Sequence, residues 1–250
     1  MPIAYARALT SRTRTPRANR HLGVVLAFVA GATNAGGFLA VQQYTSHMTG
    51  IVSAMTDNLA LGHYGLVWTG AGAVLSFVAG AACCAVMVNY ARRQQMQSEY
   101  ALPLLAEAML LLCFGMMGGW MSRIEGLFVP VTVMLLCFIM GLQNAVVTKI
   151  SRAEIRTTHI TGMVTDVGIE LGKLFYWNSP TPAGQAPVLA DRQRLGVLCL
   201  LLAAFFVGGV VGALGFEHLG YLSTLPLATA LVALAIVPAF DDVAARLRRR

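Results

Sequence analysis

The residues of this chain that could do chemistry occur as the same short pattern twice. The first copy contains Gly31-Ala32-Thr33-Asn34 followed by His47-Met48-Thr49-Gly50, and the second contains Gly141-Leu142-Gln143-Asn144 followed by His159-Ile160-Thr161-Gly162. Each copy lies next to an apolar run long enough to cross a bilayer. An internal duplication of small and polar residues in an apolar chain is typical of secondary transporters, which build a central site from two related halves.

The repeated polar residues are candidates for binding a solute. Histidine titrates near physiological pH, and an asparagine amide can bond across helices or to a substrate. A Thr-Gly pair near a helix start offers free N–H groups and close backbone approach to an anion or a polar oxygen. The alternative is structural, with each threonine capping a helix and each histidine bonding a carbonyl. The predicted substrate-binding residues are Asn34, His47, Thr49, Gly50, Asn144, His159, Thr161 and Gly162.

Four carboxylates in apolar surroundings are candidates for ion or proton coupling. A carboxylate inside lipid is costly and usually faces a cavity or a charged partner. The candidates are Asp57, Glu107, Asp166 and Glu170. The alternative is that they are neutral or salt-bridged structural groups. The two repeated histidines with two aspartates could supply four metal ligands, but their spacing matches no recognised metal motif. We therefore predict no metal and no other cofactor.

These residues must be positioned by membrane helices. The 250 residues are 57% hydrophobic and 12% charged, with a mean hydropathy of +0.67, which is far from an ordinary soluble domain. Spanning the hydrocarbon core takes about 20 apolar residues in a helix, and a barrel is disfavoured because the runs do not alternate. The predicted crossings are 22–41, 66–88, 101–121, 127–148, 195–215 and 219–240. Two shorter stretches, 47–62 and 159–175, are predicted as re-entrant segments or half-helices.

The placement of lysine and arginine predicts the topology. Cytoplasmic loops collect these residues. If the two short stretches do not cross, 17 of the 18 lie inside and only Arg123 lies outside, whereas 13 lie inside if both cross. Six crossings are therefore favoured, with basic cytoplasmic tails at 1–21 and 241–250. The two repeats, 22–121 and 127–240, then contain three crossings each and have opposite orientations, as in inverted-repeat transporters.

The second copy forms a long run from Gly141-Leu142-Gln143-Asn144-Ala145 through Glu154-Ile155-Arg156-Thr157-Thr158-His159-Ile160-Thr161-Gly162 to Asp166-Val167-Gly168. This run resembles the signature of the YoaK-like family of bacterial inner-membrane proteins. The segment Ser46-His47-Met48-Thr49-Gly50 is similar to the N-terminal motif of the same family. The resemblance covers the chain from about Leu22 to Phe240. It implies a multi-pass protein of the bacterial inner membrane, with a domain of unknown function and no assigned activity.

Three functions remain open at this point. The first is a small-solute or ion transporter or channel with a site between the two repeats. The second is a membrane-embedded His/Asp metalloenzyme, although the sequence contains no catalytic motif and we expect no enzyme. The third is a structural or lipid-interacting membrane protein. The net charge of +7 is explained by an anionic inner leaflet and needs no nucleic acid. The expected partners are the lipid bilayer, a small solute or ion and, in a homo-oligomer, a second copy.

Overall fold

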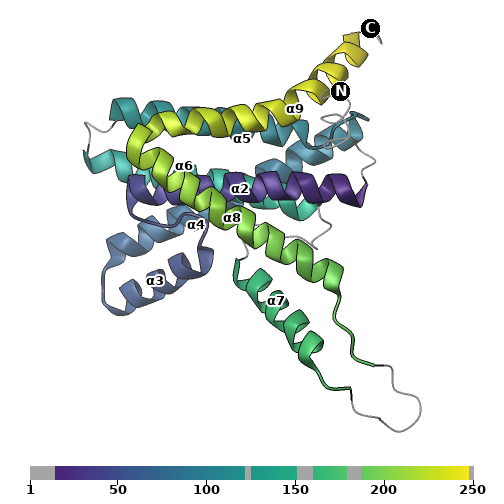
Figure 1. Cartoon of the computed structure of the whole chain (residues 1–250). Coiled ribbons are helices and arrows are strands. Elements are labelled where there is room, and N and C mark those ends of the chain that lie inside the picture. The colour runs from purple at the N-terminus through teal and green to yellow at the C-terminus, as the bar shows by residue number, and fades with distance from the viewer. Residues whose placement is uncertain (1–14, 122–124, 151–159, 179–186, 248–250) are drawn as a thin grey trace.

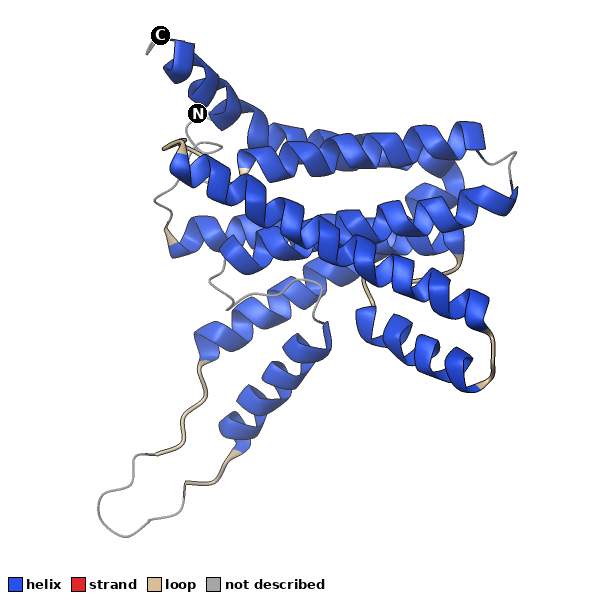
Figure 2. Ribbon diagram, turned by 180° about the vertical axis from the view of Figure 1, so that it is seen from behind, coloured by secondary structure: helices blue, strands red, loops and turns tan. Residues whose placement is uncertain are grey.

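The apolar runs of the sequence fold as α-helices (Figures 1 and 2). The structure, a computed structural model, describes residues 15–121, 125–150, 160–178 and 187–247, and these residues form helices and connecting turns without a β-strand. The all-α fold class is thus confirmed. The helices are α2 (Pro16–Val41), α3 (Met48–Ala60), α4 (Tyr64–Arg93), α5 (Ala101–Met121), α6 (Glu125–Ile150), α7 (Ile160–Phe175), α8 (Arg192–Leu219), the 3₁₀ turn η1 (Gly220–Ser223) and α9 (Thr224–Leu247).

Several helices extend beyond the apolar runs that predicted them. α2 begins at Pro16, inside the predicted tail 1–21, and α9 continues to Leu247, inside the predicted tail 241–250. Apolarity ends where charged residues begin, but backbone hydrogen bonding continues into the polar boundary of a membrane. At the start of α2, the Thr15 side chain accepts a hydrogen bond from the Ala18 amide and Pro16 occupies the first turn. The sequence therefore predicts the apolar segments better than the helix ends.

Five segments of the described chain are long and apolar enough to cross a membrane. They are Arg17–Val41, Tyr64–Arg93, Ala101–Gly118, Val129–Lys149 and Arg192–Asp242. The chain is thus compatible with a multi-pass membrane protein. The last segment spans 51 residues and contains both α8 and α9, separated by η1. One straight helix of that length would measure about 76 Å, more than twice the hydrocarbon core.

The first half of the chain packs into the second half. α2 lies against α8, so the first helix of one half pairs with the third helix of the other. Gly208 of α8 meets Phe28 of α2, and two turns further along both helices Phe216 meets Gly36. The two helices therefore run parallel.

The same relation joins α4 and α6 with the halves exchanged. Gly72 of α4 meets Met134 of α6, and about two turns further along both helices Gly80 meets Leu142. These helices also run parallel. Together with α5 and α9, which pack against each other, every long helix of the described chain is thus paired with a helix from the other half.

The remaining contacts between the halves are antiparallel. α2 meets α6, where the Gln143 amide donates to the Leu26 carbonyl and Gly37 meets Leu136. In α5 and α9, Gly115 lies beside Thr224 near one end. At the other end, the Asp242 carboxylate accepts hydrogen bonds from the backbone amides that precede α5, those of Gln97 and Ser98.

Four matching glycines hold the parallel pairs together. Each is the last residue of a Phe-x-x-Gly segment: Phe28–Gly31 in α2, Phe77–Gly80 in α4, Phe138–Gly141 in α6 and Phe205–Gly208 in α8. A Cβ atom on any of these glycines would overlap the carbonyl oxygen of the phenylalanine in the partner helix, in the pairs Gly31 with Phe205, Gly208 with Phe28, Gly80 with Phe138 and Gly141 with Phe77. Small residues permit such close backbone contact, which is a main source of helix association in lipid.

The two short helices fold back along their neighbours. α3 packs on α4 and α7 packs on α8, and both begin beside the middle of the long helices and run toward opposite ends (Figures 1 and 2). With 13 and 16 residues they measure about 20 and 24 Å, short of the hydrocarbon core. The fourth residue of each is buried: Ile51 packs in a cluster with Ala73, and Met163 packs in a cluster with Leu201. The predicted stretches 47–62 and 159–175 therefore correspond to two similarly placed short helices.

Adding one methyl group should distinguish a glycine in a close helix contact from a glycine with open space around it. In α8, Gly208→Ala forces the Phe28 carbonyl away and should destabilise the protein by about 1–3 kcal/mol. In the same helix Gly196 has open space around the position of a Cβ, so Gly196→Ala should be neutral or stabilising by up to about 1 kcal/mol. Thermal unfolding of the two variants in detergent measures both effects. Equal melting temperatures would contradict the close-contact role of Gly208.

Candidate functional site

The first repeated motif lies where the chain enters α3. His47 is the residue before the helix, and its side chain makes no capping hydrogen bond. The imidazole instead folds over Gly50, where any side chain would overlap the ring. Thr49 is exposed in the first turn and is not the cap. Gly50 therefore makes room for His47, and the expected capping role of the threonine does not apply to Thr49.

The two matched asparagines have different partners. The Asn34 side-chain oxygen accepts a hydrogen bond of 2.8 Å from the Ser46 hydroxyl, which fastens the segment before α3 to α2. The Asn144 amide donates to the Met140 carbonyl of its own helix at 2.8 Å. Within the described residues no hydrogen bond joins Asn34 to Asn144. Asn34 thus positions the motif that contains His47, whereas Asn144 makes only a local bond.

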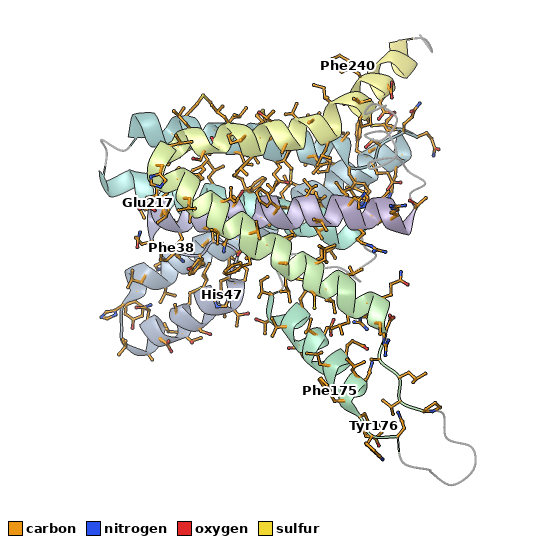
Figure 3. All side chains as sticks on the ribbon, in the orientation of Figure 1. Phe38, His47, Phe175, Tyr176, Glu217 and Phe240 are labelled. Atoms are coloured by element: carbon orange, nitrogen blue, oxygen red, sulfur yellow. The ribbon has the colours of Figure 1, made fainter. Side chains whose placement is uncertain are left out.

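A cavity of about 460 Å³ opens beside the first motif. It lies between the end of α2, the segment that leads into α3, and the facing turns of α3 and α4. Figure 3 shows Phe38 and His47 on this side of the bundle, below the ribbon of α2. Two of the predicted binding residues, His47 and Gly50, line the cavity. The full lining consists of Phe38, Gln42, Gln43, Tyr44, His47, Gly50, Ile51, Ala54, Met55, Asn58, Leu66, Thr69 and Gly70.

The second motif is described only in part. Thr161 and Gly162 are exposed in the first turn of α7, and His159 lies outside the described residues. Neither Thr161 nor Gly162 lines the cavity beside α3. The structure therefore does not bring the described parts of the two motifs into one pocket.

The acids of α7 fasten this helix to the start of α8. Asp166 pairs with Arg194 at 3.0 Å between exposed groups. Glu170 is buried and accepts hydrogen bonds of 2.8 Å from both the Lys173 ammonium and the Asp191 backbone amide. The Lys173 hydrogen bond, together with that of Asp191, holds the pKa of Glu170 below its ordinary value. Both carboxylates have structural partners that explain their presence.

Asp57 has no equivalent in the second half. The short helices align from Met48 with Ile160, so the residue that corresponds to Asp57 is Ile169 rather than Asp166. Asp57 is exposed in the last turn of α3. Asp57 and Asp166 both follow a His-x-Thr-Gly motif within about two helical turns, but the helical register separates them.

Glu107 lies in the core of the bundle. Its side chain is completely buried in α5, and both carboxylate oxygens have no hydrogen-bond partner in the part of the chain that the structure describes. The cluster around it joins α5 to α2, α4, α6 and α9. Cys84 of α4 lies within electrostatic range of both Glu107 and Lys149 of α6. Among the described residues no bond accounts for this carboxyl group, in contrast to those of Asp166 and Glu170.

Two buried polar residues were overlooked as site candidates. Thr33 and Gln143 occupy the same position in the two Gly-x-x-Asn motifs, and both are buried. The Thr33 hydroxyl and the Gln143 side-chain oxygen have no hydrogen-bond partner among the described residues. The signal was available, because both motif copies carry a polar residue immediately before the asparagine. Among the described residues no group of three histidine, cysteine or acidic side chains is placed to hold a metal ion.

Residues 22–237 match the family model described as "Protein of unknown function (DUF1275)". The chain belongs to the DUF1275 family. This confirms the resemblance to YoaK-like proteins, and the match covers the long helices, both short helices and the cavity. Neither a curated protein nor a solved structure matches the chain. The family description assigns no activity to this DUF1275 protein.

Loss of the Glu170 carboxylate should remove a pH-dependent part of the stability. Because its pKa is lowered on folding, the ionised form stabilises the protein above the ordinary carboxyl pKa of about 4.3, and this contribution disappears as the pH falls through the lower folded value. Glu170→Gln should lower the melting temperature by a few degrees at pH 7. The difference from the wild type should shrink below about pH 4.

Thermal unfolding in detergent between pH 2.5 and 7 measures this difference. Glu217→Gln, an exposed change near the other end of α8, is the matched control and should leave the curve unchanged. A difference that stays constant down to pH 2.5 would show that the Glu170 charge does not hold α7 to α8.

Proposed function

We propose that this DUF1275 protein is a bacterial inner-membrane transporter or channel for a small solute or ion. Its two inverted halves enclose the pathway, and the buried carboxyl group of Glu107 couples it to protons or cations. The observation that carries the proposal is Glu107, a fully buried acid in an apolar core without a partner among the described residues. Ionisable groups at membrane depth are costly and generally serve transport or relay.

The packing of the helices supports two inverted halves. α2 and α8 run parallel, α4 and α6 run parallel, and α2 runs antiparallel to α6. Opposite directions for corresponding helices are what a pseudo-two-fold axis in the membrane plane produces. The reversal at η1, with Gly220 at a φ of 57°, divides the fifth apolar segment into two crossings. We therefore infer six crossings, and the placement of lysine and arginine in the sequence favours cytoplasmic termini.

The short helices support a pathway rather than a purely structural bundle. α3 and α7 start near the middle of the long helices and bring polar backbone to that depth. Such backbone is tolerated inside a membrane only where protein buries it or where it lines a wet cavity. The segment before α3 lines a cavity of about 460 Å³. A scaffold held together by glycine contacts would need neither this cavity nor an unpaired acid.

Cysteine labelling tests the inverted halves. In a cysteine-free background, Leu61→Cys places a thiol at the exposed turn after α3, and Tyr176→Cys places one at the exposed end of α7. An impermeant thiol reagent added to intact cells should label the Leu61→Cys variant and leave the Tyr176→Cys variant unlabelled. Both variants should react after permeabilisation, which is the control. Labelling of both from outside would show that the two halves have the same orientation.

A hydrophobic carbodiimide tests the state of Glu107. Such reagents modify protonated carboxyl groups in apolar surroundings, and an unpaired carboxyl in an apolar site favours its neutral form. Mass spectrometry should find the modification at Glu107 and not at the ion-paired Asp166 or Glu170. The Glu107→Gln variant should remain unmodified. Absence of the modification at Glu107 in folded wild-type protein would contradict a protonated, reagent-accessible acid.

Transport itself is measured in proteoliposomes loaded with a pH-sensitive dye. Small amides, sugars, amino acids and alkali cations are added outside, with and without a pH gradient. At least one should enter faster than in protein-free vesicles, and the gradient should accelerate its entry. Glu107→Gln should abolish the acceleration while leaving expression intact. Equal uptake by the variant would remove Glu107 from the mechanism, and no uptake of any solute would favour a structural protein.

A further inference from the structure

The cavity beside α3 has the size of a small-molecule site. Its volume of about 460 Å³ falls in the range of roughly 300–1,000 Å³ found for ligand pockets and far exceeds the space of one water molecule. In the topology proposed above, it lies in the outer half of the bundle. The lining combines apolar side chains of α3 and α4 with hydrogen-bonding side chains from the segment between α2 and α3.

The described lining of this cavity carries no lysine, arginine, aspartate or glutamate. A buried charged ligand needs an opposite charge or several strong dipoles, because the loss of hydration is costly. The nearest acid of α3, Asp57, is not part of the lining. The composition of the walls therefore favours an uncharged ligand.

The polar groups of the cavity are mainly carboxamides. Gln42, Gln43 and Asn58 line it, together with the His47 imidazole and the Thr69 hydroxyl. A carboxamide offers both a donor and an acceptor, which complements an amide or imide edge on a ligand. Asn58 uses part of this capacity locally, since its amide donates to the Ala54 carbonyl at 2.7 Å. The two glutamines lie on the segment that leaves α2.

A stacked pair of aromatic rings forms part of the cavity wall. Phe38 and Tyr44 stack with their centroids 4.5 Å apart and their planes at 19°. The reversal that brings Tyr44 back over α2 occurs at Gln42, which has a left-handed φ of 55°. The backbone N–H of Gln42 donates to the Phe38 carbonyl. Stacked rings favour planar partners over bulky ones. Both rings line the cavity.

The geometry points to a binding site for a small, uncharged, planar molecule with an amide or imide edge. The ring of such a ligand would lie against the Phe38–Tyr44 wall, and its edge would bond to the Gln42 and Gln43 side chains. His47, held in place by its contact with Gly50, would contribute one more donor or acceptor. This inference rests on the proposed transport function, for which it names the solute class and the outer binding site.

Ligand binding is measured on the full-length protein in detergent by ligand-observed NMR titration with nicotinamide and with uracil as probes. At least one should bind with a dissociation constant of about 1 mM or lower. Nicotinate has the ring of nicotinamide with a charged carboxylate in place of the amide, so it should bind at least tenfold more weakly. Tyr44→Leu and Gln43→Leu should each weaken binding at least tenfold, and Gln94→Leu, an exposed change of the same kind at the far end of α4, should not.

Melting temperatures establish that each variant is folded, and if Tyr44→Leu is not, Gln43→Leu still decides. Absence of binding by both probes, or equal binding of nicotinamide and nicotinate, would overturn the proposed ligand class. Unchanged binding in folded Gln43→Leu would overturn the location. Binding without uptake of the bound probe into proteoliposomes would support this site while contradicting the transport function. Uptake of a solute without probe binding at this site would support the transport function while contradicting this site.

Discussion

Direct contact between glycine and a backbone carbonyl sets the arrangement of this protein. In lipid, helices gain little from burying apolar surface against one another, so close packing and backbone contacts must hold them. The four Phe-x-x-Gly segments supply these contacts in two reciprocal pairs. In each pair, the carbonyl oxygen of the phenylalanine in one helix packs against the glycine of the other helix. Because each pair joins the first helix of one half to the third helix of the other, the same contact also interlocks the two halves.

The carboxylates divide into two physical classes under this arrangement. Asp166 and Glu170 lie where α7 contacts the start of α8. Asp166 pairs with Arg194, and Glu170 accepts hydrogen bonds from Lys173 and a backbone amide. Glu107 lies among apolar side chains of the core and has no such partner in the described chain. Sequence spacing cannot distinguish these classes, since all are acids in mainly apolar segments. Burial and partners separate them, and among the described residues Glu107 is the buried acid without a structural explanation.

The sequence predicted the fold class, the short helices and the family because these depend on local composition and on long motifs. Apolar runs of sufficient length specify membrane helices, and the repeated His-x-Thr-Gly segments mark the starts of α3 and α7. The partners of individual residues depend on contacts between distant segments. Asn34 and Asn144 have the same sequence context but different partners, and Asp57 falls out of register with Asp166. The Phe-x-x-Gly pattern was present in the sequence, but only the helix pairing shows its meaning.

The interlocked halves also limit how this protein can change shape. A rigid-body rotation of one half against the other would pull apart all four glycine contacts at once. α3 and α7 are attached differently, since each packs mainly along one neighbouring helix. A displacement of either short helix leaves the glycine contacts of the pairs α2–α8 and α4–α6 intact. A change of shape that preserves the four glycine contacts can therefore come from α3 and α7, one near each end of the molecule (Figure 1).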